Sequence, residues 1–438
     1  MNISIDSIQD VTLPQGALLA RGLEETESPS VKVTLRPTTA VAMLQRVESP
    51  ASVQWLQPIL LQIFALSLLI GCANFAQAGQ YFLGAEDLPL RQQLSSEAAL
   101  PLASFVEDEK RPTLISENRK IKSSWAFAFD NDLLAPGHRD RDYTYGMSLT
   151  YAGADATNAA ISLKAPLAFI DRVLRIENLP ATSQNNYSVE AGLYGFTPQD
   201  IELQQLDRSD RPYASLVYLS SSHEQVDAEN NTAWKTTLTL GALGLGIVGD
   251  LQNSAHQQIS GKEARGWNTQ ISEGGELTGR YVIARQQYLG RFADSLELKS
   301  TLQASLGYLT ETSWSLSFRN GKITSPWASF NPDLISYGEK STYSNSVQSS
   351  NEHYFWAGAS VKARFYNAFL QGQVRDSKLS YDYDDLRPII VEGWAGYTYA
   401  FRQGYRVSYV LRAQTSEIKQ GSGDRSVVWG GLIFAKTI

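Results

Sequence analysis

The sequence predicts an all-β protein, a transmembrane antiparallel β-barrel of about twelve strands. Three observations predict it. Apolar and polar residues alternate along repeated segments of about ten to fourteen residues, an export signal precedes these segments, and the chain has 21 Tyr and 9 Trp but only 3 Met and 1 Cys. Lipid-facing and lumen-facing side chains alternate in this way along each strand of a membrane barrel.

The composition excludes several other classes of protein. The chain has 38 Lys plus Arg and 45 Asp plus Glu, a formal net charge of −7, whereas nucleic-acid-binding proteins usually carry a basic face. A single Cys excludes a disulfide framework and a cysteine-rich metal site, and 4 His exclude a dense histidine metal cluster. With 43% hydrophobic and 11% aromatic residues, the chain is too apolar to be disordered.

Residues 1–78 are predicted to contain a signal peptide and, before it, a segment that lies upstream of the true start of translation. Residues 59–78 form an apolar run that ends in Ala76-Gln77-Ala78, a small-x-small cleavage site. The segment before this run is too long for the start of a signal peptide, and a start at Met43 would give one of normal length. Two alternatives remain: a retained membrane helix, or a lipoprotein signal in which Leu-Ile-Gly precedes a lipidated Cys72.

After the signal, residues 79–120 are polar and are predicted to be a periplasmic linker. From Ser123 onward the pattern changes to a period of two; Trp314, Leu316 and Phe318, for example, alternate with serines. The barrel is therefore assigned to residues 121–438. Its predicted strands are 123–132, 142–153, 186–197, 211–223, 233–247, 275–289, 294–308, 311–321, 353–366, 387–402, 404–417 and 425–436.

An even number of strands places both termini of the barrel in the periplasm. The extracellular connections are then 133–141, 198–210, 248–274, 309–310, 367–386 and 418–424. Two predicted periplasmic connections, 154–185 and 322–352, are long, which counts mildly against this register.

Three polar segments fall at the predicted extracellular rim. The first contains Asn131 and Asp132, whose hard oxygen atoms suit Ca²⁺. The second contains Asp210 and Arg211, and the third contains His256 in a predicted helix at 250–260. Each segment also has an interpretation without a function. The first would be a pair of solvated hairpin ends, the second an Arg paired with an Asp at the start of a strand, and the third a surface His.

Six short motifs follow one another along the chain. They are Asn131-Asp132, Asp142-Tyr143-Thr144-x-Gly146, Thr197-Pro198, Asp210-Arg211-Pro212-Tyr213, Gly246-x-Val248-Gly249 with His256, and Gly266-Trp267-x-x-Gln270. Together they resemble the lipid A 3′-O-deacylase (LpxR-like) family of outer-membrane proteins over about residues 123–437. The resemblance implies a twelve-stranded barrel with a Ca²⁺-dependent site at its outer rim, which removes an acyloxyacyl group from lipopolysaccharide.

The resemblance also implies roles for single residues. His256 matches the catalytic histidine, Asn131 and Thr144 match active-site residues, and Asp132 matches a metal-binding aspartate. Two positions depart from the family pattern: Lys262, beside Glu263, stands where an acidic metal-shell residue is expected, and Ser215 stands where many members have Gly.

The predicted chemistry is ester hydrolysis by water. His256 would take the proton of the water. Ca²⁺ held by Asp132 would stabilise the oxyanion, and Asn131 would orient this oxyanion or donate a hydrogen bond to it. Thr144 shares strand parity with Ser148 and Thr150, so it is predicted to point inward. Arg211, with Asp210, would bind a lipid A phosphate. The chain has no Gly-x-Ser-x-Gly nucleophile elbow, which favours water over an acyl-enzyme.

The predicted partners are therefore lipopolysaccharide and the outer membrane, with the protein acting as a monomer. Two other functions remain open at this point. One is a porin-like or structural barrel with a degenerate site; the other is a phospholipase-type barrel, which would need a serine nucleophile beside the histidine.

Overall fold

The computed structural model describes residues 123–136, 142–176, 184–203, 207–259, 263–292, 295–334 and 351–438. The predicted signal peptide in 1–78 and the linker at 79–120 lie outside these residues and stay predictions. None of the helices in the described ranges is long and apolar enough to cross a membrane.

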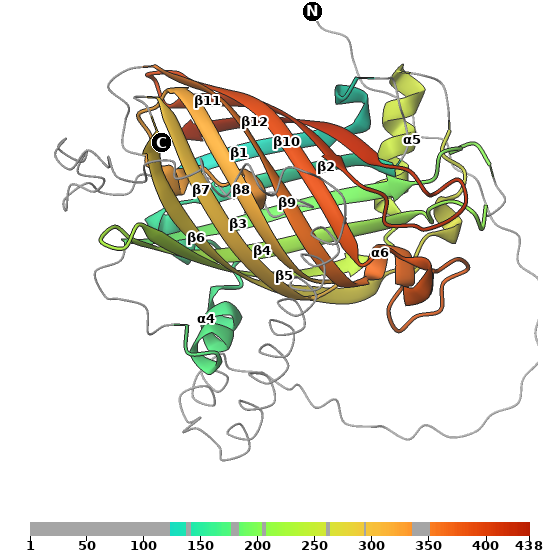
Figure 1. Ribbon diagram of the computed structural model, residues 1–438. Helices are drawn as coiled ribbons and strands as arrows, with labels where there is room; N and C mark the ends of the chain where they lie inside the picture. Colours follow the sequence, from blue (N-terminus) through green and yellow to red (C-terminus); the bar gives the residue numbers. More distant parts are fainter. Residues whose placement is uncertain are drawn as a thin grey trace, which may run out of the picture. The chain divides into compact units, whose positions relative to one another are not determined.

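The described chain forms a closed antiparallel barrel of twelve strands in which each strand pairs with the next and β12 pairs with β1 (Figure 1). The predicted fold class is confirmed. The strands are β1 (Ser124–Asn131), β2 (Asp142–Ala152), β3 (Gln184–Thr197), β4 (Ala214–Asp227), β5 (Thr232–Leu243), β6 (Glu276–Phe292), β7 (Leu296–Gly307), β8 (Leu309–Lys322), β9 (Glu352–Asn367), β10 (Ile389–Ala400), β11 (Tyr405–Gln414) and β12 (Val427–Thr437).

The strand boundaries agree with the prediction within two residues except at five ends: the start of β4 and the C-terminal ends of β4, β5, β6 and β11 differ by three or four residues. The predicted fourth strand begins at 211, but β4 begins after Pro212 and Tyr213, because proline has no N–H to donate to a neighbouring strand. The predicted fifth strand continues to 247, but β5 ends at Leu243. Gly244 adopts φ +73°, a left-handed conformation that turns the chain out of the sheet and into a helix.

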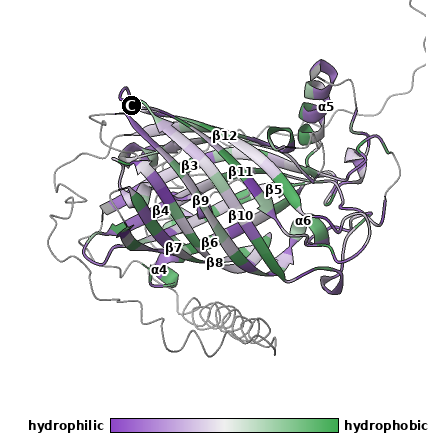
Figure 2. Ribbon diagram, turned by 45° about the horizontal axis from the view of Figure 1, so that its top comes forward, coloured by the Kyte–Doolittle hydropathy of each residue, from purple (hydrophilic) through white to green (hydrophobic). Residues whose placement is uncertain are grey.

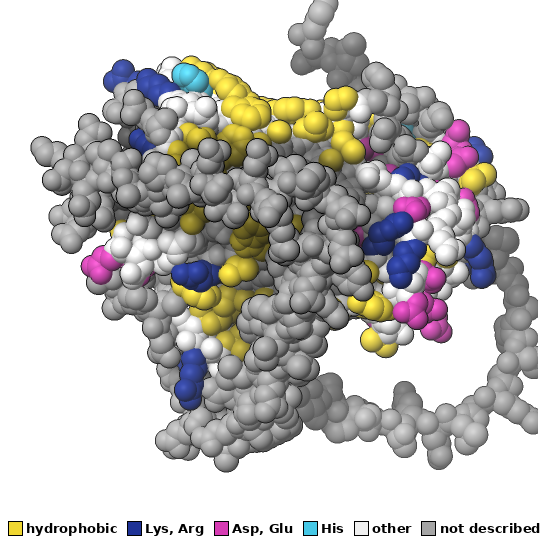
Figure 3. All heavy atoms as spheres, in the orientation of Figure 1, with side chains coloured by type: hydrophobic (Ala, Val, Ile, Leu, Met, Phe, Trp, Pro, Cys, Tyr) yellow, Lys and Arg dark blue, Asp and Glu magenta, His cyan; other side chains and the backbone are white. Residues whose placement is uncertain are grey.

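The two faces of the barrel wall differ in polarity, as the alternation predicts. Large apolar side chains are exposed on the outer face, among them Trp125, Phe127, Leu149, Leu240, Leu302, Trp314, Phe355, Val391, Tyr409 and Phe434. Buried charged residues line the inner face: Glu190, Glu224, Lys235, Arg280, Glu297, Lys299, Glu311, Arg319, Lys362, Arg364, Glu392 and Arg412. Figure 2 shows hydrophobic and hydrophilic residues mixed along the strands, and Figure 3 shows hydrophobic side chains over the wall.

The charges inside the barrel are paired across neighbouring strands. Glu311 of β8 lies 3.4 Å from Arg280 of β6 and 2.7 Å from Arg364 of β9, and Glu392 of β10 lies 2.5 Å from Lys362. Removing a charge from water costs several kcal/mol unless a partner and hydrogen bonds compensate for it. These pairs therefore allow the lumen to be filled with charged side chains.

The two ends of the barrel carry different structures. The terminal end, where β1 begins and β12 ends, carries α4 (Lys164–Val173) and η3 (Ala154–Asn158). The opposite end, called the distal end below, carries η2 (Asp132–Leu134), α5 (Ile247–Ile259), η5 (Trp267–Thr269), α6 (Ala368–Gln371) and η8 (Tyr383–Asp385) (Figure 1). Acidic and basic side chains gather at the distal end in Figure 3.

The connection between β8 and β9 enters the lumen at the terminal end. It contains η6 (Trp327–Ser329) and η7 (Pro332–Leu334). On one side Asn331 donates to Glu224 of β4, and on the other side Arg412 of β11 donates to the carbonyl of Pro332. Since β4 and β11 lie on different sides of the ring, this segment crosses the lumen. The long connection at 322–352 is thus compatible with the predicted register.

We expect this arrangement to prevent steady ion conduction. Trp327 packs against Val226 and Ala233, and Phe330 packs against residues of β9 and β10, so the crossing segment is anchored by apolar contacts as well as hydrogen bonds. Purified protein in a planar lipid bilayer should therefore show no stable open-channel current. Replacing residues 325–334 with a Gly-Ser segment of equal length should produce one, whereas a stable current from the wild type would contradict the arrangement.

Candidate functional site

The first part of the site lies where β1 ends. Asn131 points to the outer face, like Phe129 and Phe127, whereas Asp130 points inward and accepts a hydrogen bond from Tyr143. The Asn131 side chain donates to the Thr144 carbonyl at 2.7 Å and accepts from the Leu133 N–H at 2.6 Å. It thereby caps η2, whose first residue, Asp132, is only 1% exposed.

Thr144 points to the outer face, so the prediction that it points inward is wrong. The pairing of β2 with β3 shifts by one residue between Tyr143 and Tyr145, which marks Thr144 as the extra residue of a β-bulge. A bulge reverses the relation between sequence parity and sheet face. Tyr143 faces the interior, but the Thr144 hydroxyl lies 2.6 Å from that of Thr197, which follows the inward-facing Phe196.

Helix α5 covers this part of the outer wall, and the predicted helix around His256 is confirmed. Val248, Gln252 and His256 are spaced four residues apart, so they share one face of the helix, and all three are buried. Tyr145 of β2 donates to the Val248 carbonyl, which fixes this face against the wall.

Glycines allow this close packing. A Cβ atom at Gly195 of β3 would lie 3.1 Å from Val248 and 3.0 Å from Trp267, and one at Gly249 would lie 2.5 Å from Trp267. The Trp267 indole donates to the Gln252 side chain at 2.7 Å, so the chain after α5 folds back onto it. Gly195 and, in the fifth motif, Gly249 therefore serve this packing, whereas a Cβ atom at Gly246 would meet nothing within 4 Å.

The structure thus brings Asn131 and Thr144 together on the outer wall of β1 to β3 at the distal end, where Val248, on the same face of α5 as His256, also packs. This region is called the wall site below. Sequence reasoning did not single out Tyr145 or Gln252. The i, i+4 spacing from Val248 through Gln252 to His256 could have indicated Gln252.

Asp210 and Arg211 lie elsewhere, at the distal mouth of the lumen. Arg211 is 6% exposed, its guanidinium covers the ring of the inward-facing Phe196 at 4.8 Å, and its Nε lies 3.8 Å from the Asp142 carboxylate. Asp210 accepts hydrogen bonds from the Gln199 N–H and from Arg425. Arg211 is therefore the partner of an Asp at the start of a strand, which is the interpretation without a function given above.

Arg425 joins these loops. It contacts Asp142 at 2.8 Å and Asp210 at 2.6 Å. Burial lowers the pKa of Arg425, but the two carboxylates outweigh burial and raise it above its usual value. The network ties the start of β2, the 198–213 connection and the 415–426 connection together. A substrate-binding role for Asp210 and Arg211 stays a prediction.

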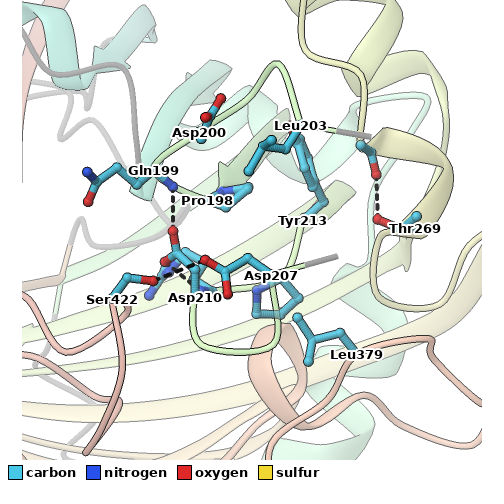
Figure 4. A pocket seen from close by; sticks show the side chains of 13 residues that line it. Pro198, Gln199, Asp200, Leu203, Asp207, Asp210, Tyr213, Thr269, Leu379 and Ser422 are labelled. Carbon is cyan, nitrogen blue, oxygen red and sulfur yellow. Dashed lines mark hydrogen bonds between the residues drawn. The ribbon is translucent and has the colours of Figure 1, made fainter. Parts of the chain in front are cut away.

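A pocket of about 250 Å³ opens beside this network (Figure 4). Its lining includes Asp207, Asp210, Tyr213, Thr269 and Leu379, which come from three separate connections at the distal end. Hydrogen bonds from the hydroxyl and N–H of Ser209 lower the pKa of Asp207. Tyr213 also packs at 5.0 Å against the Trp267 ring, so the pocket borders the structure that holds α5.

A family model named "Outer membrane protein LpxR" matches residues 99–437, most of the chain. The chain belongs to the LpxR family. Its barrel is therefore an outer-membrane barrel, as the sequence predicts. A search of curated proteins found no match.

The fold is similar to that of a solved LpxR structure. LpxR from Salmonella typhimurium superposes with a TM-score of 0.56 at 16% identity, over 72% of this chain and 100% of that one. The β domain of the Bordetella autotransporter BrkA and the COG4313 outer membrane channel from Pseudomonas putida F1 each match with a TM-score of 0.36 and 8% identity; the matches cover 73% and 76% of this chain and all of theirs. The likeness to LpxR, at 16% identity, shows the fold alone.

Metal ligands in this LpxR-family barrel would be mostly neutral oxygens. In the described ranges, no group of three or more His, Cys, Asp and Glu side chains could hold a metal ion. The wall site offers the buried Asp132 carboxylate, the hydroxyls of Thr144 and Thr197 and nearby carbonyls, a donor set of the type that Ca²⁺ prefers. Lys262 lies outside the described residues, and Glu263 is largely exposed and pairs with Arg265 at 3.4 Å.

Proposed function

We propose that this protein is an ester hydrolase that removes a 3′-linked acyloxyacyl chain from lipid A. Membership of the LpxR family supports a lipid A deacylase in general terms. The observation that carries the proposal is the position of the wall site. Its polar groups lie on the outer, lipid-facing side of the barrel, where an acyl chain in the membrane would meet them and a water-soluble substrate would not.

In the proposed reaction His256 acts as the general base. A neutral imidazole can take the proton of an attacking water. The Asn131 amide is held by the Thr144 carbonyl, so it is positioned at the strand end where an oxyanion could be oriented. Thr144 and Thr197 would position the substrate ester or the water between β2 and β3.

Ca²⁺ is the proposed cofactor, held chiefly by Asp132. When bound, it would supply positive charge to polarise the ester carbonyl. The protein contributes the placement of that charge, because η2 is capped by Asn131 and its first residue is buried against the wall. By contrast, Asp130 faces the interior, Asp142 pairs with an arginine, and Asp250 of α5 is exposed.

The structure gives less support to the two other candidate functions. A porin needs an open lumen, but a segment between β8 and β9 crosses it. A phospholipase-type mechanism needs a serine nucleophile beside the histidine. Ser254, the serine nearest in sequence, donates to the Asp250 carbonyl at 2.8 Å and is exposed, away from the buried face of α5.

The direct test uses purified protein in detergent with hexa-acylated lipid A. We expect mass spectrometry to show lipid A that has lost the 3′-linked acyloxyacyl chain, together with the released fatty acid ester. Lipid A that already lacks this chain is the matched control and should not change. Loss of a chain from another position would contradict the proposed specificity.

Removal of Ca²⁺ should abolish this activity. Asp132 is the buried carboxylate of the wall site and most of the other oxygen donors there are neutral, so the ion should be held weakly enough for a chelator to extract it. We expect excess EGTA to stop turnover and added Ca²⁺ to restore it, measured by the same product analysis. Unchanged turnover in excess EGTA would contradict a role for the metal.

A further inference from the structure

Helix α4 lies on the outside of the barrel wall near the terminal end (Figure 1). Leu167 packs against Leu238 of β5 and Tyr281 of β6. Leu238 shares strand parity with Leu240, which is 45% exposed on the outer face, so the wall beneath α4 is the lipid-facing side of the barrel. The helix therefore occupies a position where membrane would otherwise contact the strands.

A buried carboxylate fixes α4 in this position. Asp171, 3% exposed, accepts hydrogen bonds from Thr236 of β5 at 2.9 Å and from Tyr281 of β6 at 2.7 Å. His223 of β4 lies 3.9 Å from the same carboxylate. A carboxylate on a lipid-facing wall is costly unless it is satisfied by partners, so these contacts are specific to the docked helix.

Exposed apolar and basic side chains surround the docked face of α4, on the helix and on the residues that flank it. Phe169 is 55% exposed, and Ile161, just before the helix, is 66% exposed. Lys164, Arg172 and Arg175 are also exposed, whereas the acid of this segment, Asp171, is buried. Neither Lys164 nor Arg175 forms an ion pair with another described residue; the Lys164 ammonium lies 5.2 Å from the centre of the Tyr187 ring.

We propose that α4 is an interfacial helix that binds the head groups of anionic phospholipids in the leaflet at the terminal end of the barrel. The wall beneath it is the lipid-facing surface of β5 and β6, so the membrane is the partner already in contact with this side of the barrel. Exposed aromatic and aliphatic side chains flanked by cations are typical of helices that lie in the plane of the interface. Each Lys or Arg near an anionic surface adds about 1 kcal/mol of attraction, about fivefold in affinity.

A fluorophore at position 169 tests both parts of the proposal. The full chain carries Cys72→Ser, which removes its single Cys, and Phe169→Cys, at an exposed position. The labelled protein is placed in nanodiscs of equal parts phosphatidylglycerol and phosphatidylcholine, with one of the two brominated. A label at Glu229, exposed in the turn between β4 and β5 at the same end, is the matched control. Heat-modifiable migration on gels verifies folding.

We expect brominated lipid to quench the label at 169, and aqueous iodide to quench the label at 229. Brominated phosphatidylglycerol should quench more strongly than brominated phosphatidylcholine. This preference should fall by up to about fivefold per charge in Lys164→Gln and Arg175→Gln. It should persist in Lys436→Gln, which removes a cation that contacts Tyr405 elsewhere at the terminal end.

Two results would overturn the proposal. If iodide quenches the label at 169 as strongly as the label at 229, this face of α4 lies in water and serves another partner or none. If the two brominated lipids quench equally in the wild type, the cations do not select anionic head groups.

Discussion

His256→Ala should lower the turnover of lipid A by about 10²–10⁴-fold, the usual effect of removing a general base. His256 lies on the buried face of α5 together with Val248 and Gln252. Two contacts that hold the helix, from Tyr145 to the Val248 carbonyl and from Trp267 to Gln252, do not involve the imidazole. The variant should therefore fold, with heat-modifiable migration unchanged, while product formation measured by mass spectrometry is nearly lost.

Two other histidines provide matched controls. His223 stacks on Tyr187 and bonds to Asn185, and His353 stacks on Tyr399 at the terminal end. Alanine at either position should leave turnover near the wild-type value; His138 lies outside the described residues but is expected to behave in the same way. If His256→Ala keeps most of the activity and one of these variants does not, the wall site is misplaced.

Asp132→Ala should cost about as much turnover as His256→Ala, but for a different reason. Asp132 is the buried carboxylate at the start of η2, and its loss would remove the main anionic ligand of Ca²⁺. Asp132→Asn keeps the shape and one oxygen donor, so its defect should be milder and should shrink as Ca²⁺ is raised. Titrating Ca²⁺ against turnover separates the two residues, because no Ca²⁺ concentration should rescue His256→Ala.

A matched control for this pair is Asp130→Asn. Asp130 is adjacent in sequence but faces the interior and accepts from Tyr143. Its substitution should leave the Ca²⁺ dependence of turnover unchanged. An equal shift of that dependence in Asp130→Asn and Asp132→Asn would refute the assignment of the metal to the outer side of the wall.

The twelve strands could be predicted from the sequence because one physical cause repeats along the whole chain. A side chain on one face of the wall meets lipid and its neighbour meets the polar lumen, so each strand carries the same period of two. The wall between Leu296 and Phe318 shows it most plainly: Leu302, Leu306 and Trp314 are exposed outside, while Lys299 and Arg319 are buried inside.

The face on which Thr144 lies could not be predicted in the same way. Counting by twos from Ser148 gives the inner face, but the bulge at Thr144 reverses the count. The local composition does not indicate a bulge, because the residues around Thr144 are good strand formers. Only the pairing with β3, which lies more than forty residues further along the chain, shows that Thr144 meets Thr197.

Nor could the sequence separate the wall site from the lumen mouth. Asp210 and Arg211 stand in a motif beside Tyr213, whose ring packs on Trp267 under α5, yet their own side chains turn to Asp142 and Arg425 inside the barrel. Helix α4 was not predicted either, and its residues were assigned to the connection at 154–185. The helical spacing of Leu163, Leu167, Ile170 and Leu174 could have indicated it.

Lipid A from intact cells shows whether the wall site removes the 3′-linked acyloxyacyl chain. Cells that express the wild type, His256→Ala or no protein are compared by mass spectrometry of their lipid A. We predict that wild-type cells contain lipid A lighter by the 3′-linked acyloxyacyl chain, and that the other two contain the unmodified form. Unmodified lipid A in wild-type cells with folded barrel in the outer membrane, or equal conversion by His256→Ala, would contradict the account.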